Sequence, residues 1–277
     1  HWGAGDAVAQ QAVLSGTDGE SCYGLLSPCI GYAGWWRLDE GRGAVAADAS
    51  TGKLSGLLRD LGVSAPGWIA GRRGTGLWFE DDAGDVGIPD GASLSMAGGV
   101  LEVSFESGED LTGSDPTAGV MPLVSKAGYQ TFNDGFVINL SNPTRAGFII
   151  AASSDGQQKA VHSAASTWDA GAWYGLNALF GDGGMELLTD GAPGLAALPY
   201  SGGISDPAAP LTLGSYHYDG DTWVTHWGGL DEVRFMSRAL AADELLQYPP
   251  AAWTIGAQVG CVPACDGKLC GDDSCGG

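Results

Sequence analysis

Short apolar or alternating runs, separated by Gly, Asp, Asn and Pro, fill the chain from Tyr32 to about Pro249. Examples are GLWF (76–79), VLEVSF (100–105), GFVIN (135–139), GFIIAA (147–152), WYGLNALF (173–180), MELLTD (185–190), LTLGSY (211–216) and LDEVRF (230–235). Many short strands with turn signals between them are typical of a sandwich or a barrel. Asp-Gly pairs at 134–135, 155–156 and 190–191 suit the positive φ that hairpin turns need. The pattern predicts an all-β domain over residues 32–249.

The two ends of the chain lack this strand-like sequence pattern. Residues 1–31 show no sustained period of 2 or 3.6, which predicts an extended N-terminal arm. SRALAADELLQY (237–248) predicts one short helix, because Ala and Leu recur at helical spacing and Pro249 stops it. Residues 250–277 form a Cys/Gly-rich tail that is too poor in apolar residues to fold without cross-links.

Six cysteines lie in these terminal segments, at Cys22, Cys29, Cys261, Cys265, Cys270 and Cys275. An even number in Gly-rich flanks predicts disulfides and an oxidising, extracellular location. Zinc is the alternative, but the paired C-x₂-C spacing is missing and the tail has no His. Connectivity stays open, although the clustering favours Cys22–Cys29, closing a small loop in the arm, and two bridges within the tail.

The charge balance narrows the choice of partner. A formal net charge of −21, from 33 acidic and 12 basic residues, argues against nucleic acid. It favours solubility and hard cations such as calcium, although a solvated acidic surface without a specific partner also accounts for it. No run of about 18 apolar residues is present, so membrane insertion is not expected.

Several segments, taken in order, resemble the laminin-G-like (concanavalin A-like) jelly-roll family. They are GWWRLDEGRGAVAADAS (34–50), GTGLWFEDDAGDVGIPDGASLSMAGG (74–99), LVSKAG, WDAGAWYGLNALFGDGGMELLTDGAPG, APLTLGS and GGLDEVRFMSRALAADEL (228–245). The resemblance implies a two-sheet antiparallel jelly-roll sandwich. One departure is Glu102-Val103-Ser104-Phe105, where the family usually has an aromatic residue after the Glu. The tail CVPACDGKLCGDDSCGG resembles Cys-rich linkers in secreted proteins of gliding, predatory bacteria.

The resemblance also implies a structural calcium ion. Asp48, in the AADAST loop, and Asp231, in the closing strand, match family positions where carboxylates near the two chain ends hold an ion. Calcium takes six to eight oxygen ligands, so carbonyls or waters would complete the shell. The alternative is that Asp48 caps a turn through its side chain. Asp81-Asp82-Asp85 and Asp219-Asp221 are second choices.

A ligand-binding loop is predicted in SYHYDGDTWVTHW (215–227), where Tyr216, Tyr218 and Trp223 surround a two-Asp turn. Sugars dock on exposed aromatic faces flanked by a few polar groups, so this composition suits carbohydrate. The alternative is a core role, since alternation along a strand sends some of these rings inward.

Paired carboxylates for glycoside hydrolysis are not found. Glu102 and Glu106 fall on one face of a strand but about 13 Å apart, beyond the ~9.5 Å limit for an inverting pair. Alternation predicts opposite faces for Asp231 and Glu232. We therefore expect no catalytic residue and disfavour a glycoside hydrolase.

Two function classes remain. The first is a secreted, non-catalytic binding or adhesion module for carbohydrate or a cell surface. The second is a structural subunit of an extracellular filament or surface assembly, joined to copies of itself through the arm or the tail.

Overall fold

The computed structural model describes residues 32–62, 64–80, 84–108, 121–127, 134–142, 145–151, 158–164, 167–204, 208–218 and 222–237. These ranges consist of strands, turns and one short 3-10 turn, η1 (Ala92–Leu94). No helix within them is long and apolar enough to cross a membrane. The predicted helix at 237–248, the six cysteines, the arm and the tail lie outside the described residues, so these predictions stay untested.

Two large sheets and one small one make up the fold. Sheet A has the order β14-β13-β12-β7-β18-β5-β4, and β1 also pairs with β18. Its strands are β1 (Tyr32–Trp36), β4 (Gly67–Ala70), β5 (Thr75–Phe79), β7 (Gly99–Ser107), β12 (Trp173–Gly181), β13 (Gly184–Thr189), β14 (Ala192–Pro193) and β18 (Gly228–Met236). β5 and β1 pair with successive halves of the same edge of β18, which brings the first and last described strands together.

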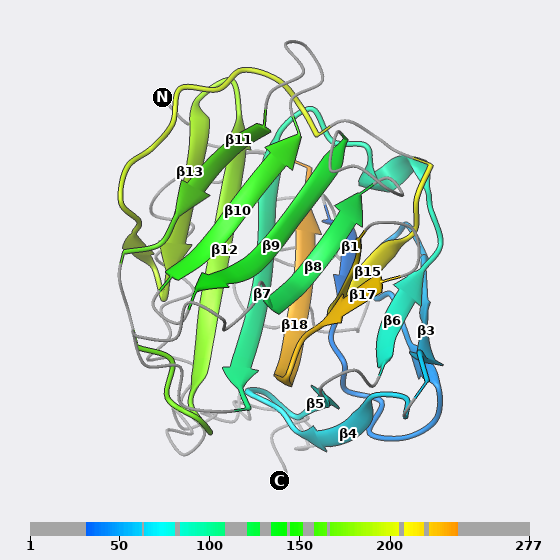
Figure 1. Ribbon diagram of the computed structural model, residues 1–277. Coiled ribbons are helices and arrows are strands. Elements are labelled where there is room, and N and C mark those ends of the chain that lie inside the picture. Colours follow the sequence, from blue (N-terminus) through cyan, green and yellow to red (C-terminus); the bar gives the residue numbers. More distant parts are fainter. Residues whose placement is uncertain are drawn as a thin grey trace, which may run out of the picture.

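Sheet B has the order β11-β10-β9-β8-β15-β6-β3-β2. Its strands are β2 (Val45–Ala46), β3 (Gly56–Asp60), β6 (Gly84–Ile88), β8 (Met121–Ala127), β9 (Gly135–Asn142), β10 (Arg145–Ala151), β11 (Gln158–His162) and β15 (Leu211–Leu213). The small sheet is a hairpin of β16 (Ser215–Tyr218) and β17 (Thr222–Thr225). In Figure 1, sheet B lies in front of sheet A.

Every strand pair in the described ranges is antiparallel. The prediction of an antiparallel β-sandwich is therefore confirmed, while the finer jelly-roll assignment stays a prediction. Each of the eight quoted apolar runs overlaps a strand, and LTLGSY is divided between β15 and β16. Asp190 and Gly191, with φ of 51° and 77°, form the predicted tight turn between β13 and β14.

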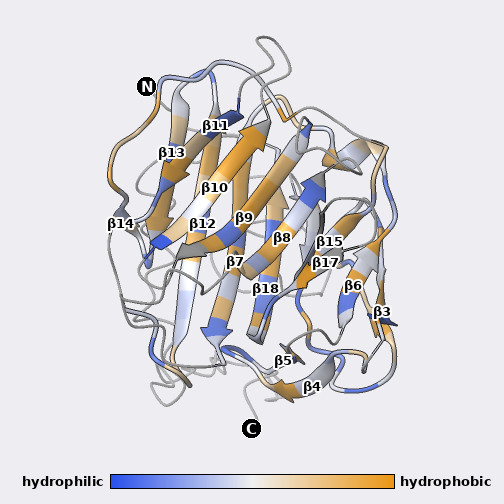
Figure 2. Ribbon diagram, viewed as in Figure 1, coloured by the Kyte–Doolittle hydropathy of each residue, from blue (hydrophilic) through white to orange (hydrophobic). Residues whose placement is uncertain are grey.

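The main core lies between the sheets and consists of the inward side chains of both, for example Trp36, Phe105, Phe148 and Phe235, each fully buried. Figure 2 shows apolar colour concentrated on the strands of both layers. A second, smaller cluster lies on the opposite face of sheet A, and its members are Tyr32, Trp35, Val100, Leu179, Leu188 and Met236. Sheet A thus carries buried side chains on both faces.

Candidate functional site

Polar side chains gather on the face of sheet A that points away from the main core, next to the second cluster. On β7, Leu101, Val103 and Phe105 belong to the main core, so the alternate residues face outward. Register aligns these with residues of β12 and β18 in rows. In the order β12, β7, β18, the rows are Trp173, Glu106 and Gly229; Gly175, Ser104 and Asp231; Asn177, Glu102 and Arg234.

A β-bulge in β18 adds a third carboxyl group to this face. Leu230 and Val233 both belong to the main core, yet two residues rather than one separate them. Glu232 has a φ of 50°, a conformation that residues with a side chain rarely adopt. The prediction that alternation sends Asp231 and Glu232 to opposite faces was wrong, because the extra residue of the bulge turns both away from the main core.

The third row carries a charged network. Arg234 Nε lies 2.9 Å from Glu102 Oε2, and the Asn177 side-chain amide donates to Glu102 Oε1 at 2.7 Å. The exposed fractions of Glu102 and Arg234 are 3% and 6%. Asn177 thus holds one oxygen of Glu102 by a hydrogen bond, and Arg234 faces the other oxygen as an ion pair.

Arg72 reaches over the second row. Its guanidinium lies 3.5 Å from Ser104 Oγ and 3.5 Å from Asp190 Oδ1. Asp190 Oδ1 also accepts the Gly175 N–H at 2.8 Å. Burial lowers the pKa of Arg72, against the effect of Asp190, but an arginine stays charged in proteins. Two contacts at the long limit of hydrogen bonding engage only part of its five N–H donors.

Glu232 is held at one oxygen only. The Trp35 indole N–H donates to Oε2 at 2.9 Å, whereas Oε1 is buried and has no hydrogen-bond partner among the described residues. Burial raises the pKa of Glu232, although Arg234 and the indole act in the opposite direction. An unsatisfied buried acceptor costs about 1–3 kcal/mol. Glu232 is therefore held by Trp35 at the border of sheet A's polar face.

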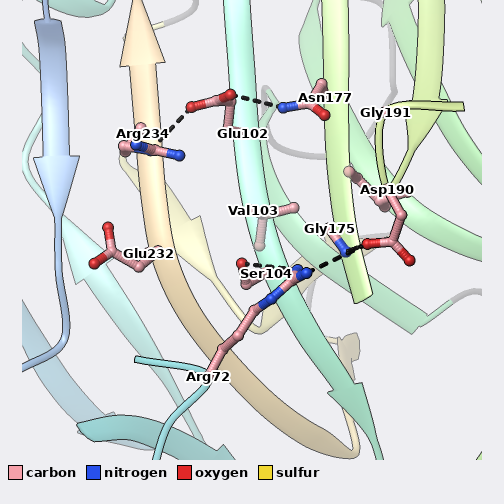
Figure 3. Close-up of a pocket in the computed structure, with 11 residues that line it drawn as sticks. Arg72, Glu102, Val103, Ser104, Gly175, Asn177, Asp190, Gly191, Glu232 and Arg234 are labelled. Atoms are coloured by element: carbon pink, nitrogen blue, oxygen red, sulfur yellow. Dashed lines mark hydrogen bonds and ion pairs between the residues drawn. The ribbon is translucent and has the colours of Figure 1, made fainter. Parts of the chain in front are cut away.

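These groups enclose a small depression, which we call the sheet A depression. Its lining residues are Arg72, Glu102, Val103, Ser104, Gly175, Leu176, Asn177, Asp190, Gly191, Glu232 and Arg234. Figure 3 shows Arg72 reaching across Ser104 towards Asp190, with the Glu102 network above it and Glu232 at one side. Its volume of about 30 Å³ is room for one or two water molecules. A larger ligand would place one polar group here and lie over the rest of the face.

The predicted calcium ligands have partners within the chain. The Asp48 carboxylate accepts the backbone N–H groups of Trp35, Ser50 and Leu54 at 2.8–2.9 Å. This is the turn-capping role that the sequence left as the alternative. Asp231 accepts the backbone N–H groups of Arg73 and Glu232, each at 2.8 Å.

Burial, followed by the nearby Glu232 carboxylate, raises the pKa of Asp231 to about 9. Of the second choices, Asp85 is fully buried and binds Arg59 and Ser215, while Asp81, Asp82, Asp219 and Asp221 lie outside the described residues. Among described residues, no three His, Cys, Asp or Glu side chains converge to hold a metal ion. The described carboxylates do not by themselves form a calcium shell, and calcium at Asp48 and Asp231 stays a prediction.

The predicted aromatic loop lies on the other side of the sandwich. Ser125 and Thr212 lie on the outer face of sheet B and donate to the Ser215 carbonyl at 2.9 and 2.8 Å. These hydrogen bonds hold β16 against the outer face of sheet B. Tyr216 lies on β16 with partial exposure. The side chains of Tyr218 and Trp223 lie outside the described part, so a ligand role for the three residues stays a prediction.

No protein-family model and no curated protein matches the sequence. Solved structures do match. The binding domain of a paraclostridial mosquitocidal protein is similar with a TM-score of 0.62 and 11% identity, over 79% of this chain and 51% of that one. Domain 4 of an extracellular arabinanase from Geobacillus stearothermophilus, in complex with arabinotriose, has a TM-score of 0.53 and 14% identity, over 79% and 98% of the two chains.

A Trypanosoma rangeli sialidase, in complex with the inhibitor DANA, has a TM-score of 0.55 and 12% identity. The match covers 92% of this chain but 38% of the sialidase. This chain therefore spans about half of the toxin chain and well under half of the sialidase. At these identities the likeness shows the fold alone: the chain has an antiparallel β-sandwich of the kind found in these binding and sialidase domains.

Proposed function

We propose that this protein is a non-catalytic carbohydrate-binding module, and that the sheet A depression takes part in binding. The observation that carries the proposal is the guanidinium of Arg72, which is 8% exposed and, among the described residues, is engaged by two contacts of 3.5 Å. Together with the Asp190 carboxylate, whose side chain is 30% exposed, it offers both donors and an acceptor within one depression. Sugar hydroxyls both donate and accept, so a mixed set of this kind suits them.

The contacts of Glu102 and Asp190 favour binding over hydrolysis in this proposal. Glycosidases need one carboxyl group free to donate a proton and a second to attack or to activate water. Both Glu102 oxygens are held by Arg234 and Asn177, and Asp190 holds the Gly175 N–H and Arg72. These carboxylates orient their neighbours, which is what a binding surface requires.

The structural likenesses support a binding role. Two of the matched structures are a toxin's binding domain and an arabinanase domain with a bound oligosaccharide, and this chain covers nearly all of the latter. Secretion and adhesion belong to the same proposal and depend on the predicted disulfides. The assembly alternative depends on residues 1–31 and 250–277, which lie outside the described part, and no described contact favours it.

The test is an array of immobilised oligosaccharides, followed by titration of the tightest-bound glycan. The Arg72→Leu variant should bind it at least about tenfold more weakly, because it loses charge-assisted hydrogen bonds. Arg42→Leu is the matched control, since Arg42 is exposed on a loop away from sheet A's depression and should leave affinity unchanged. Absence of any bound glycan, or equal losses in both variants, would contradict the proposal.

A further inference from the structure

The first row on the outer face of sheet A carries two tryptophans. Trp173 on β12 pairs with Glu106 on β7, Glu106 pairs with Gly229 on β18, and Gly229 pairs with Trp78 on β5. The neighbours of Trp78 along β5, Leu77 and Phe79, belong to the main core, so Trp78 lies on the outer face. Two indole rings and one carboxyl group therefore share one row of this face.

Neither tryptophan contributes to the packing of the sandwich. Trp78 and Trp173 are half-buried, and neither belongs to or packs against the main core or the second cluster. A Cβ on Gly229 would lie 2.9 Å from Trp173 Cη2 and 3.3 Å from Glu106 Cβ. The Trp173 indole thus reaches across β7 to β18, along the surface of the sheet, and keeps part of its area in contact with solvent.

Glu106 lies between the two tryptophans in this row and is also half-buried. Burial raises the pKa of Glu106, and no ion pair or hydrogen bond among the described residues opposes that effect. Its carboxylate can accept hydrogen bonds at both oxygens. A carboxylate next to partly exposed indole rings offers hydrogen-bond acceptors beside an apolar surface, which suits a sugar ring with one C–H face and a rim of hydroxyl groups.

The row borders the sheet A depression. The second row, which contains Gly175 and Ser104 of the depression, is two residues further along the strands, or about 7 Å away. Arg72 reaches over that second row. Neighbouring sugar residues of one ligand can therefore contact the first row and Arg72 at the same time.

From this arrangement we infer that Trp78, Trp173 and Glu106 form a sugar-stacking subsite beside the depression, and that the ligand is an oligosaccharide that contacts both. The inference rests on the proposed carbohydrate-binding function. One sugar ring packs its C–H face on the indole surface and donates hydroxyl groups to Glu106, while a neighbouring sugar residue reaches Arg72.

The first experiment titrates the native chain with the tightest-bound glycan of the array and with its monosaccharide components. Each monosaccharide fills one subsite only, so it should bind at least about tenfold more weakly than the whole glycan. A monosaccharide that binds as tightly as the whole glycan would overturn the inference and leave the proposed function standing.

Variants test the stacking contact. Trp173→Ala and Trp78→Ala should each weaken binding about five- to tenfold, whereas Trp173→Phe keeps an aromatic ring and should stay within about threefold. Leu57→Ala is the matched control, because Leu57 is an apolar side chain with 58% exposure on β3 of the other sheet. Melting curves establish that each variant folds. If Arg72→Leu weakens binding but both alanine variants bind like the native chain, this inference fails and the proposed function stands. An array without any bound glycan would overturn both.

The part of Glu106 is tested in the same way. Glu106→Gln should bind about three- to tenfold more weakly, because it loses charge-assisted hydrogen bonds to the sugar. Glu186→Gln is its control, since Glu186 lies on β13 of the same sheet, away from the first row and the depression. Equal affinities of these two variants would refute the contact with Glu106.

Fluorescence gives a measurement that a purely structural role would not affect. The bound glycan should protect the native chain from quenching by acrylamide, because it covers the exposed parts of both indole rings. A Trp78→Phe, Trp173→Phe double variant still binds but lacks these two indoles, so the protection should disappear. Undiminished protection in the double variant would show that the glycan covers other tryptophans, and would overturn the inference.

Discussion

Burying two adjacent carboxyl groups, Asp231 and Glu232, in a sheet costs desolvation free energy. Neither exceeds 2% exposure, and no Lys or Arg side chain contacts Asp231 by an ion pair in the described ranges. Asp231 accepts two backbone N–H groups, of Arg73 and of Glu232 itself. The second bond fixes the bulge and thereby the direction of Glu232. Asp231 is a positioning residue for Glu232.

The raised pKa of Asp231 gives stability a dependence on pH. Its folded pKa of about 9 exceeds the unfolded value of 3.8, so between these limits the folded state holds the extra proton. This contribution is complete below pH 3.8 and is lost as pH rises through 9. Burial lowers the pKa of fully buried His226 to about 4. This residue therefore makes the free energy of unfolding rise between pH 4 and 6.5, and it leaves the slope above pH 6.5 unchanged.

We therefore expect the free energy of unfolding to fall from pH 6.5 to 9. Urea titrations at several pH values measure it, and Asp231→Asn should show a shallower slope, because the amide has no proton to lose. Burial also raises the pKa of Glu232, which acts in the same direction as Asp231. Identical slopes in the two proteins would contradict the assignment.

At the scale of elements, Gly175 on β12 makes room for the Arg72 guanidinium. A Cβ at this position would lie 2.8 Å from Arg72 Nη1 and 3.5 Å from Asp190 Oδ1. Because the obstructing atom ends a flexible side chain, the guanidinium can move away at small cost. The glycine therefore matters more to the position of Arg72 than to the stability of the sheet.

We expect Gly175→Ala to weaken glycan binding about tenfold, by displacing Arg72, while the melting temperature changes little. Gly67→Ala is the matched control, because Gly67 lies on β4 of the same sheet and its Cβ would meet nothing within 4 Å. Calorimetric titration and thermal melting of the two variants make the comparison. Unchanged binding by Gly175→Ala would show that the position of Arg72 does not matter.

The strands could be predicted from the sequence, and the site largely could not. Runs such as WYGLNALF carry a local signal, so β12 was found where expected. The depression instead joins Glu102, Asn177 and Arg234 on three strands with Arg72 in the turn between β4 and β5. These segments lie far apart in the sequence and meet only through sheet order. Alternation correctly predicted that Glu102 and Glu106 share one face of β7. No local sequence pattern predicted the bulge that changes the direction of Glu232.

At the scale of the whole molecule, the two candidate ligand surfaces lie on opposite sides. The depression is on the outer face of sheet A, and the hairpin of β16 and β17 sits on the outer face of sheet B. Packed sheets lie about 10 Å apart, so the two surfaces cannot contact one sugar residue together. Binding losses in Arg72→Leu and in Trp223→Ala therefore report on separate sites.

Charge is the other property of the whole molecule. With 33 acidic and 12 basic residues, the folded chain holds a formal net charge of −21 in a small volume, and self-repulsion destabilises it. Added salt screens this repulsion, because the Debye length falls from about 30 Å at 0.01 M to about 10 Å at 0.1 M. We expect the melting temperature at pH 7 to rise over that range of sodium chloride. A fall would show that attractive pairs such as Arg59–Asp85 outweigh the net charge.

The same melting experiment tests the calcium prediction when the two salts are compared at equal ionic strength. An ion bound at 100 times its dissociation constant adds about 2.7 kcal/mol to stability, beyond any screening. If Asp48 and Asp231 hold it, an Asp48→Ala, Asp231→Ala double variant loses that extra rise and chelator removes it from the native protein. The double variant is less stable in either case, because the backbone N–H groups of Trp35, Ser50, Leu54, Arg73 and Glu232 lose their acceptors. The decisive quantity is therefore the difference between calcium and sodium for each protein, and an equal response of the native protein to both salts would leave the two carboxylates as acceptors for the backbone alone.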